Sequence, residues 1–171
     1  CIMGAIPFIQ QLQSCLDFSA GNNIFIKNMK LLCPWIETFY AYDIEPRNTS
    51  EIVEQDFLKL SPFKVDLIGF NPPFGYCSKL AKQFLQHGSK FKPSFFLLIL
   101  PHCASYIYPE YYKEILSIPL NDDSFYVPTS MVTYRVKNCH FVILQRDETF
   151  IYQKIKKEEI IFDDMHIIYK M

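Results

Sequence analysis

The segment from Val65 to Cys77 reads VDLIGFNPPFGYC and is the most informative stretch of this chain. Its first six residues, 65–70, are nearly all apolar, which predicts a strand buried in a parallel sheet. Pro72 and Pro73 then end the strand, because each lacks a backbone N–H and has a fixed φ. Ligands of open α/β sheets bind at such carboxyl ends of strands. The segment therefore predicts a binding corner directly after a strand of the sheet.

The corner itself, Asn71-Pro72-Pro73-Phe74, suits an amine substrate. The Asn71 side-chain oxygen and the Pro72 carbonyl can both accept hydrogen bonds from one –NH2 group. The ring of Phe74 offers a flat apolar face for a planar, conjugated substrate. These four residues are the candidate catalytic residues. Taken alone, the tetrapeptide is also compatible with a plain proline turn after a buried strand.

Strands and helices are predicted to alternate on both sides of the corner, the pattern of an α/β fold with a mostly parallel sheet. Strands are predicted at residues 13–18, 38–44, 52–53, 65–70, 94–100, 124–127 and 140–145, and helices at 24–32, 78–87 and 111–118. Ser78 is the expected cap of the helix after the corner, and Gly88 its expected stop. The last two strands are expected to be an antiparallel pair that closes the sheet.

The Asn-Pro-Pro-Phe corner resembles motif IV, the D/N/S-P-P-Y/F signature, of the S-adenosylmethionine-dependent amino-methyltransferases. Enzymes with this motif methylate adenine N6, cytosine N4, guanine N2 or a glutamine amide. The resemblance implies a Rossmann-like class I methyltransferase fold with helices on both faces of the sheet. It also implies S-adenosylmethionine as the cofactor.

Earlier strand ends carry residues that fit the other motifs of such a cofactor site. Asp17, Ser19 and Gly21 belong to DFSAGN, a strand followed by a glycine turn, in which Gly21 lets the backbone come close and Asp17 can accept from the methionine ammonium. Asp43, or its neighbour Glu45, can receive both ribose hydroxyls. The predicted cofactor-binding residues are Asp17, Ser19, Gly21, Asp43, Asp56, Phe57 and Asn71, with Asp56 accepting from the adenine amine and Phe57 covering the base.

A narrower resemblance joins these motifs with the later segments FLLILP and SFYVP. Over roughly residues 13–130, the chain is similar to the methyltransferase-like domain of the plant Enhanced Downy Mildew family. The same corner occurs in cap-adjacent adenosine N6-methyltransferases. By this resemblance the expected substrate is adenine N6 in RNA or DNA, with RNA favoured. A messenger RNA cap is one candidate location.

The length and hydrophobic content of the chain limit the number of domains it can form. The 171 residues, half of them hydrophobic, suit one domain with a core at about 13–146 and a C-terminal extension at 147–171. The chain begins with Cys1, so we expect it to start inside a larger product. No apolar run approaches the roughly 20 residues of a membrane span, and an intracellular protein is expected, with nucleus and cytoplasm not distinguished.

The cysteines and histidines give no metal motif. The six cysteines lack C-x-x-C spacing, so we expect no metal site and mostly buried, reduced thiols. His87, His102 and His140 are assigned structural roles. A formal net charge of −1 argues against a chain that is basic over its whole surface. The lysines Lys79, Lys82, Lys90 and Lys92 favour either a local basic face beside the corner or an ordinary solvated helix surface.

Three functions stay open from the sequence. The leading one is a nucleobase amine methyltransferase, and the second keeps the fold but moves the substrate to guanine N2 or a protein glutamine amide. The third is a catalytically silent scaffold, favoured by the single glycine in the turn. No long insertion separates the motifs, so we expect substrate selection to come from a protein partner, a flanking domain, or the short loops after Pro101 and around residues 121–127.

Overall fold

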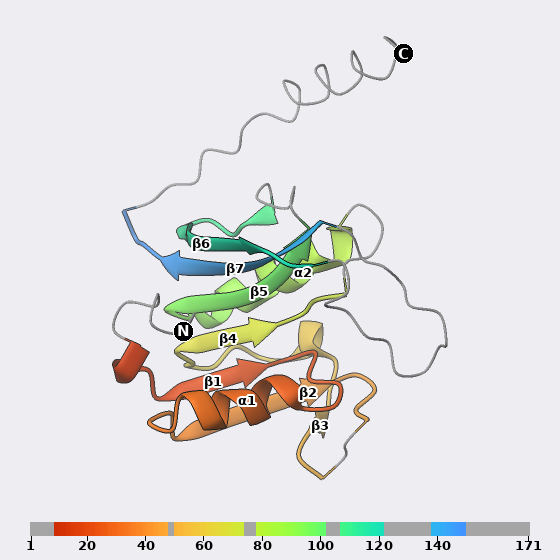
Figure 1. Ribbon diagram of the computed structural model, residues 1–171. Helices are drawn as coiled ribbons and strands as arrows, with labels where there is room; N and C mark the ends of the chain where they lie inside the picture. Colours follow the sequence, from red (N-terminus) through yellow and green to blue (C-terminus); the bar gives the residue numbers. More distant parts are fainter. Residues whose placement is uncertain (1–8, 48–49, 74–77, 102–106, 122–137, 150–171) are drawn as a thin grey trace.

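The computed structural model describes residues 9–47, 50–73, 78–101, 107–121 and 138–149, and a seven-stranded sheet forms its centre (Figure 1). The strands are β1 (Ser14–Asp17), β2 (Thr38–Asp43), β3 (Val53–Glu54), β4 (Leu67–Phe70), β5 (Phe95–Pro101), β6 (Tyr112–Pro119) and β7 (Cys139–Arg146). The helices are α1 (Ile24–Leu32) and α2 (Lys79–Gly88), with 3-10 turns η2 (Ile9–Gln11), η3 (Phe57–Lys59) and η5 (Ser89–Phe91).

The strand order, β3-β2-β1-β4-β5-β7-β6, reverses direction between β1 and β4. The paired neighbours from β3 to β5 are parallel, and β7 runs antiparallel to both β5 and β6. This is the predicted mostly parallel sheet with an antiparallel closing strand. In open α/β sheets the point where the order reverses is where ligands bind, at the carboxyl ends of the strands. Here that point lies directly after Asp17 and Phe70.

Successive side chains of the strands fill two cores, one on each face of the sheet. Leu16 and Ile68 pack with α2 residues on one face. Cys15 and Leu67, one position earlier in each strand, pack with α1 residues on the other. Figure 1 shows the two helices on opposite faces. The buried strands therefore hold two layers of helix around a single sheet, as predicted.

The structure also shows the burial of three cysteines and the bounds of helix α1, which the sequence predicts. Cys15, Cys33 and Cys139 are buried, as expected, and the remaining three lie outside the described residues. Helix α1 has the predicted bounds and ends where the Cys33 N–H donates to the Met29 carbonyl at 2.8 Å. Across the described ranges, no helix combines the length and apolar character needed to cross a membrane.

Helix α2 has the predicted position, but the predictions for its two ends are wrong in detail. Ser78 is the N-cap residue, yet its φ of 55° is left-handed and its side chain makes no capping hydrogen bond. Gly88 is the last residue of the helix with an ordinary helical φ of −58°, so it does not end the helix through a left-handed turn. Its small size serves packing instead, because a Cβ there would lie 3.1 Å from the Phe96 ring.

The predicted helix at 111–118 is wrong, because this segment forms strand β6. Its pairing with β7 changes register between Glu114 and Leu116. The Tyr112 hydroxyl donates to the Pro93 carbonyl at 2.8 Å and fixes the start of the strand. The predicted strand at 140–145 is confirmed as β7, and it pairs with β6. The segment 124–127, predicted as its partner, lies outside the described residues.

Gly69 in β4 lies against α1, and the Phe25 ring occupies the space that a side chain at position 69 would need. A methyl group at Gly69 overlaps that ring and forces it to move. Gly69→Ala should lower the free energy of unfolding in urea by about 1–3 kcal/mol. The double variant Gly69→Ala/Phe25→Leu should recover part of this loss. An unchanged free energy of unfolding in Gly69→Ala would contradict this packing.

Candidate functional site

The carboxyl ends of β1, β2, β3 and β4 carry the polar residues singled out from the sequence. Asp17 and Asp43 are the last residues of β1 and β2. Asp56 follows β3 and precedes η3, and Asn71 follows β4. Because these strands are parallel neighbours, all four residues lie at one edge of the sheet. Contacts between the segments bind this edge together.

The glycine turn after β1 is held by the end of β2. Gly21 has a φ of +51°, a left-handed conformation that favours glycine. Its N–H donates to Asp43 Oδ2 at 2.8 Å, and its carbonyl accepts from the Arg47 N–H at 3.1 Å. The neighbouring Ala20 N–H donates to the Tyr42 carbonyl at 3.1 Å. The turn therefore has a fixed position relative to the acidic end of β2.

Asp17 is the buried carboxyl of the site, with only 3% of its surface exposed. Burial raises its pKa to about 7. The Ser19 N–H, which donates to Asp17 Oδ1 at 3.0 Å, acts in the opposite direction, and the nearby Asp43 charge raises the pKa further. Asp17 therefore exchanges its proton near neutral pH. A bound cation would favour its ionised form.

Asp43 combines a structural role with open acceptor capacity. Its Oδ2 accepts from Gly21 and its Oδ1 accepts from the Glu45 N–H at 2.8 Å. A carboxylate has about four lone-pair sites, so each oxygen can accept one more hydrogen bond. Glu45, the alternative from the sequence, is exposed and lies beyond the end of the strand. The geometry favours Asp43 as the acceptor for a diol.

The Phe57 ring, which the sequence predicts to cover a bound base, lies in the core. This ring is 2% exposed and stacks on Phe18 with 3.5 Å between ring centroids and 6° between planes. The η3 turn directs it into the core on the α2 side of the sheet. Asp56 caps that turn, since its Oδ1 accepts from the Leu58 N–H at 3.0 Å. Leu58, which the sequence did not single out, is the more exposed apolar side chain there.

The Asn-Pro-Pro corner lies across from the glycine turn. The Asn71 side chain is exposed, Pro72 is buried and Pro73 is exposed. The Ser19 hydroxyl donates to the Asn71 main-chain carbonyl at 3.2 Å. Phe74 lies outside the described residues. The structure thus links the cofactor-motif turn directly to the predicted amine corner.

The histidines at positions 87 and 140 have structural contacts. His87 Nε2 is 3.0 Å from the Leu60 carbonyl oxygen, and its ring meets Phe57 edge-on. His140 Nδ1 is 2.9 Å from the Ser117 hydroxyl, far along the sheet in β7. Both support the structural assignment, whereas His102 lies outside the described residues. In the described parts of the chain, no three His, Cys, Asp or Glu side chains gather as metal ligands.

The expected lysine face divides into two parts. Lys79 and Lys82 lie on the first turn of α2, close in sequence to the corner. Lys90 and Lys92 follow the other end of this ten-residue helix, roughly 15 Å away. Only the first pair is placed to meet a charged group at the corner.

Two polar residues that the sequence did not single out join distant segments of the chain. Asn23, 2% exposed, precedes α1 and donates from Nδ2 to Glu51 Oε2 at 3.0 Å, while its Oδ1 has no hydrogen-bond partner among the described residues. Asp66 joins the starts of β4 and β1, because its Oδ2 accepts from the Ser14 N–H and hydroxyl and from the Gln13 N–H. Because Asp66 and Ser14 are 52 positions apart in the sequence, no local sequence pattern predicts their contact.

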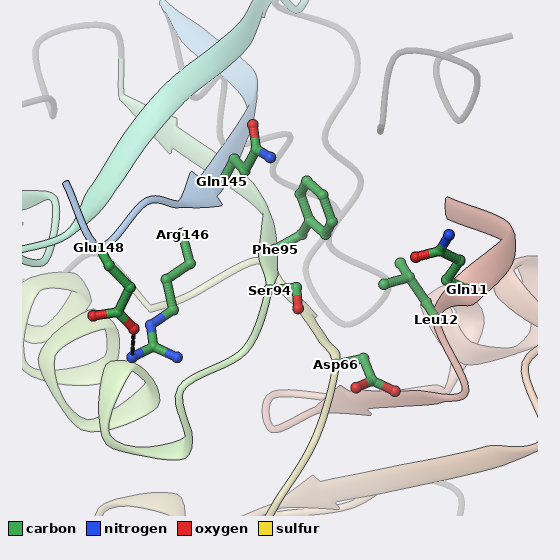
Figure 2. A pocket seen from close by; sticks show the side chains of 8 residues that line it. All are labelled: Gln11, Leu12, Asp66, Ser94, Phe95, Gln145, Arg146 and Glu148. Atoms are coloured by element: carbon green, nitrogen blue, oxygen red, sulfur yellow. Dashed lines mark ion pairs between the residues drawn. The ribbon is translucent and has the colours of Figure 1, made fainter. Parts of the chain in front are cut away.

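A pocket of about 410 Å³ lies at the opposite edge of the sheet (Figure 2). Its lining comes from the starts of β1, β4 and β5 and the end of β7: Gln11, Leu12, Asp66, Ser94, Phe95, Gln145, Arg146 and Glu148. Asp66 holds β1 to β4, and Arg146 forms an ion pair with Glu148. None of the predicted site residues lies in this pocket.

Comparison with known proteins identifies the family. Residues 8–154 match the EDM2 methyltransferase-like domain, so the chain belongs to this family. It is 29% identical over 133 residues to Protein ENHANCED DOWNY MILDEW 2 of Arabidopsis thaliana. That match covers 68% of the chain but only 10% of the plant protein. The predicted family resemblance is confirmed, and the chain corresponds to a small part of its curated relative.

Solved structures support the fold. A candidate RNA methyltransferase from Pyrococcus horikoshii aligns with a TM-score of 0.62 and 14% identity, over 78% of this chain and 74% of that one. The magnesium protoporphyrin IX methyltransferase of Synechocystis with bound SAM gives 0.54 and 13%, over 80% and 70%. A dimethyladenosine transferase from Plasmodium falciparum gives 0.53 and 13%, over 85% and 60%. The fold is therefore the Rossmann-like class I methyltransferase fold.

The raised pKa of Asp17 should make the stability of the folded chain depend on pH. Between pH 3.8, the ordinary pKa, and about pH 7, Asp17 is protonated in the folded chain and ionised in the unfolded chain. The free energy of unfolding therefore falls as the pH rises through this range. Asp17→Asn keeps the acceptor for the Ser19 N–H but removes the titration. Its melting temperature relative to the wild type should rise from pH 5 to pH 7 and level off above pH 7. A difference that stays constant over this range would contradict the raised pKa.

Proposed function

We propose that this chain is an S-adenosylmethionine-dependent methyltransferase that modifies an exocyclic amine of a nucleobase, with adenine N6 in RNA as the first candidate. The observation that carries the proposal is the meeting of three motifs at the sheet reversal: the glycine turn, the acidic end of β2 and the Asn-Pro-Pro corner. Membership of a methyltransferase-like family supports it.

The residues at this edge fit the cofactor. Apart from Gly21 and its two chain neighbours, no described residue has a heavy atom within 4 Å of the position that a Cβ of Gly21 would occupy, so the backbone of the turn can be approached closely. Asp17 offers a buried acceptor for an ammonium group, and Asp43 an acceptor pair for a ribose diol. When bound, S-adenosylmethionine supplies a methyl group that its sulfonium has already activated.

The protein's task is then to place the amine. Asn71 Oδ1 and the Pro72 carbonyl accept the two amine hydrogens, and this leaves the nitrogen lone pair directed toward the methyl donor. Both acceptors also stabilise positive charge as it develops on nitrogen. Because the corner provides no strong base, the substrate should be a conjugated amine rather than a basic alkylamine. Phe74 is proposed to stack on the base, which would have to leave a duplex to reach it.

RNA is proposed over DNA by family resemblance, and the cap-adjacent adenosine is one possible position. Partners are proposed for substrate recognition, since the chain spans about a tenth of its curated relative. A flanking domain or a separate protein would then present the nucleic acid. Guanine N2 and a protein glutamine amide share the same recognition chemistry, so assays of labelled methyl transfer should include RNA, DNA and protein acceptors.

A catalytically silent scaffold is the second candidate. The observation favouring it is that both Asp43 oxygens, and Asp17 Oδ1, already accept backbone N–H groups of the chain itself. In a scaffold these bonds would serve only to hold the turn in place. Calorimetry with S-adenosylmethionine separates the two, because a scaffold would give no heat of binding.

Asn71→Ala tests the amine corner. Loss of a preorganised acceptor should lower turnover on adenosine-containing RNA by about 100-fold. The cofactor Kd, measured by calorimetry, should stay within about twofold of wild type, since the Asn71 side chain is assigned here to the substrate. Asn28→Ala, on the exposed surface of α1, is the matched control and should keep full turnover. Turnover of Asn71→Ala within a few fold of wild type would reject this role.

Asp43→Asn and Glu45→Gln decide between the two acids after β2. Asp43→Asn should weaken S-adenosylmethionine binding at least about tenfold, because a charged acceptor is lost from the diol contact and from the Gly21 N–H. Glu45→Gln should change the Kd by less than about twofold, because only its backbone takes part in the contacts described. The reverse order of effects would assign the ribose to Glu45.

A further inference from the structure

Ser19 connects the two halves of the site across the point where the strand order reverses. The β1–β4 ladder pairs Cys15 with Leu67 and Leu16 with Ile68. Beyond it, the Ser19 hydroxyl donates to the Asn71 carbonyl oxygen at 3.2 Å, which joins segments 52 residues apart. This bond therefore continues the connection between β1 and β4 past the end of their ladder.

Few backbone hydrogen bonds can fix the Asn-Pro-Pro corner to which the Asn71 carbonyl belongs. Pro72 and Pro73 have no N–H, so neither can donate a hydrogen bond that fixes the corner. The carbonyl of Asn71 can still accept one, and Ser19 supplies it. A bond to this carbonyl restrains the peptide plane between Asn71 and Pro72. That plane connects the two proposed acceptors of the amine.

Ser19 is itself fixed in place. Its N–H donates to Asp17 Oδ1 at 3.0 Å, and Asp17 is buried at the end of β1. The hydrogen bonds run in sequence from the β1 carboxylate through Ser19 to the corner. A serine hydroxyl has one proton to donate. Since that proton is directed at Asn71, it is not free to be donated to a cofactor at the same time.

We propose that Ser19 is a positioning residue for the amine: its hydroxyl holds the Asn71–Pro72 peptide so that the Asn71 side chain and the Pro72 carbonyl face one –NH2 group. This inference rests on the proposed function, and it replaces the role as a cofactor contact expected for Ser19 from the sequence. It also makes the glycine-turn segment responsible for the geometry of the substrate as well as of the cofactor.

The test compares Ser19→Ala and Ser19→Thr with wild type in steady-state methylation of adenosine-containing RNA. Loss of the bond in Ser19→Ala should lower kcat by about 10-fold to 100-fold, because small displacements of a reacting group have effects of this size. KM for RNA and the Kd for S-adenosylmethionine should each stay within about twofold. Ser19→Thr keeps the hydroxyl and should recover kcat to within about threefold of wild type.

Ser89→Ala is the matched control, since it removes another hydroxyl-to-carbonyl bond, from Ser89 Oγ to the Gln86 carbonyl at 2.9 Å, away from the site. It should leave kcat unchanged. A parallel loss of cofactor affinity in Ser19→Ala would overturn the proposal in favour of a cofactor contact, and an unchanged kcat would overturn it outright. A wild type that methylates none of the acceptors would reject the proposed function itself, and the role of Ser19 with it.

Discussion

Packing around the Phe18 ring is the constraint on which the rest of the site depends. This ring is 2% exposed and lies 3.5 Å from Phe57, 4.0 Å from Phe70 and 5.7 Å from Phe84, measured between centroids. It therefore joins the ends of β1 and β4, the turn after β3 and helix α2 in one cluster. Aromatic rings bury much apolar surface and interlock, so their relative positions are hard to change.

Three polar residues of the proposed site adjoin a ring of this cluster in the sequence. Asp17 precedes Phe18, Asp56 precedes Phe57 and Asn71 follows Phe70. Fixing the three rings in the core therefore fixes where three polar side chains emerge at the edge of the sheet. Backbone and side-chain bonds complete the arrangement, from Gly21 to Asp43 and from Ser19 to Asn71. The hydrophobic core thus sets the site geometry, and hydrogen bonds refine it.

Much of this architecture could be predicted from local patterns. The strand before Asn71 and the bounds of α1 were clear because prolines, asparagines and apolar runs mark them. Strand β6 was mistaken for a helix because the register shift between Glu114 and Leu116 disrupts the two-residue alternation that identifies a strand. The direction of the Phe57 ring depends on η3 and on its partner Phe18, neither of which a local pattern reveals. The Ser19–Asn71 bond joins distant segments, so only the fold discloses it.

A crystal structure of the protein with bound S-adenosylhomocysteine tests most directly whether the cofactor binds at the carboxyl ends of the parallel strands. In that structure we expect the ribose hydroxyls on Asp43, the methionine ammonium near Asp17 and the sulfur facing the Asn71 side chain. All three contacts would then lie at the carboxyl edge of the parallel strands. Binding of the cofactor product at the opposite edge, in the pocket lined by Gln145 and Arg146, would contradict the account.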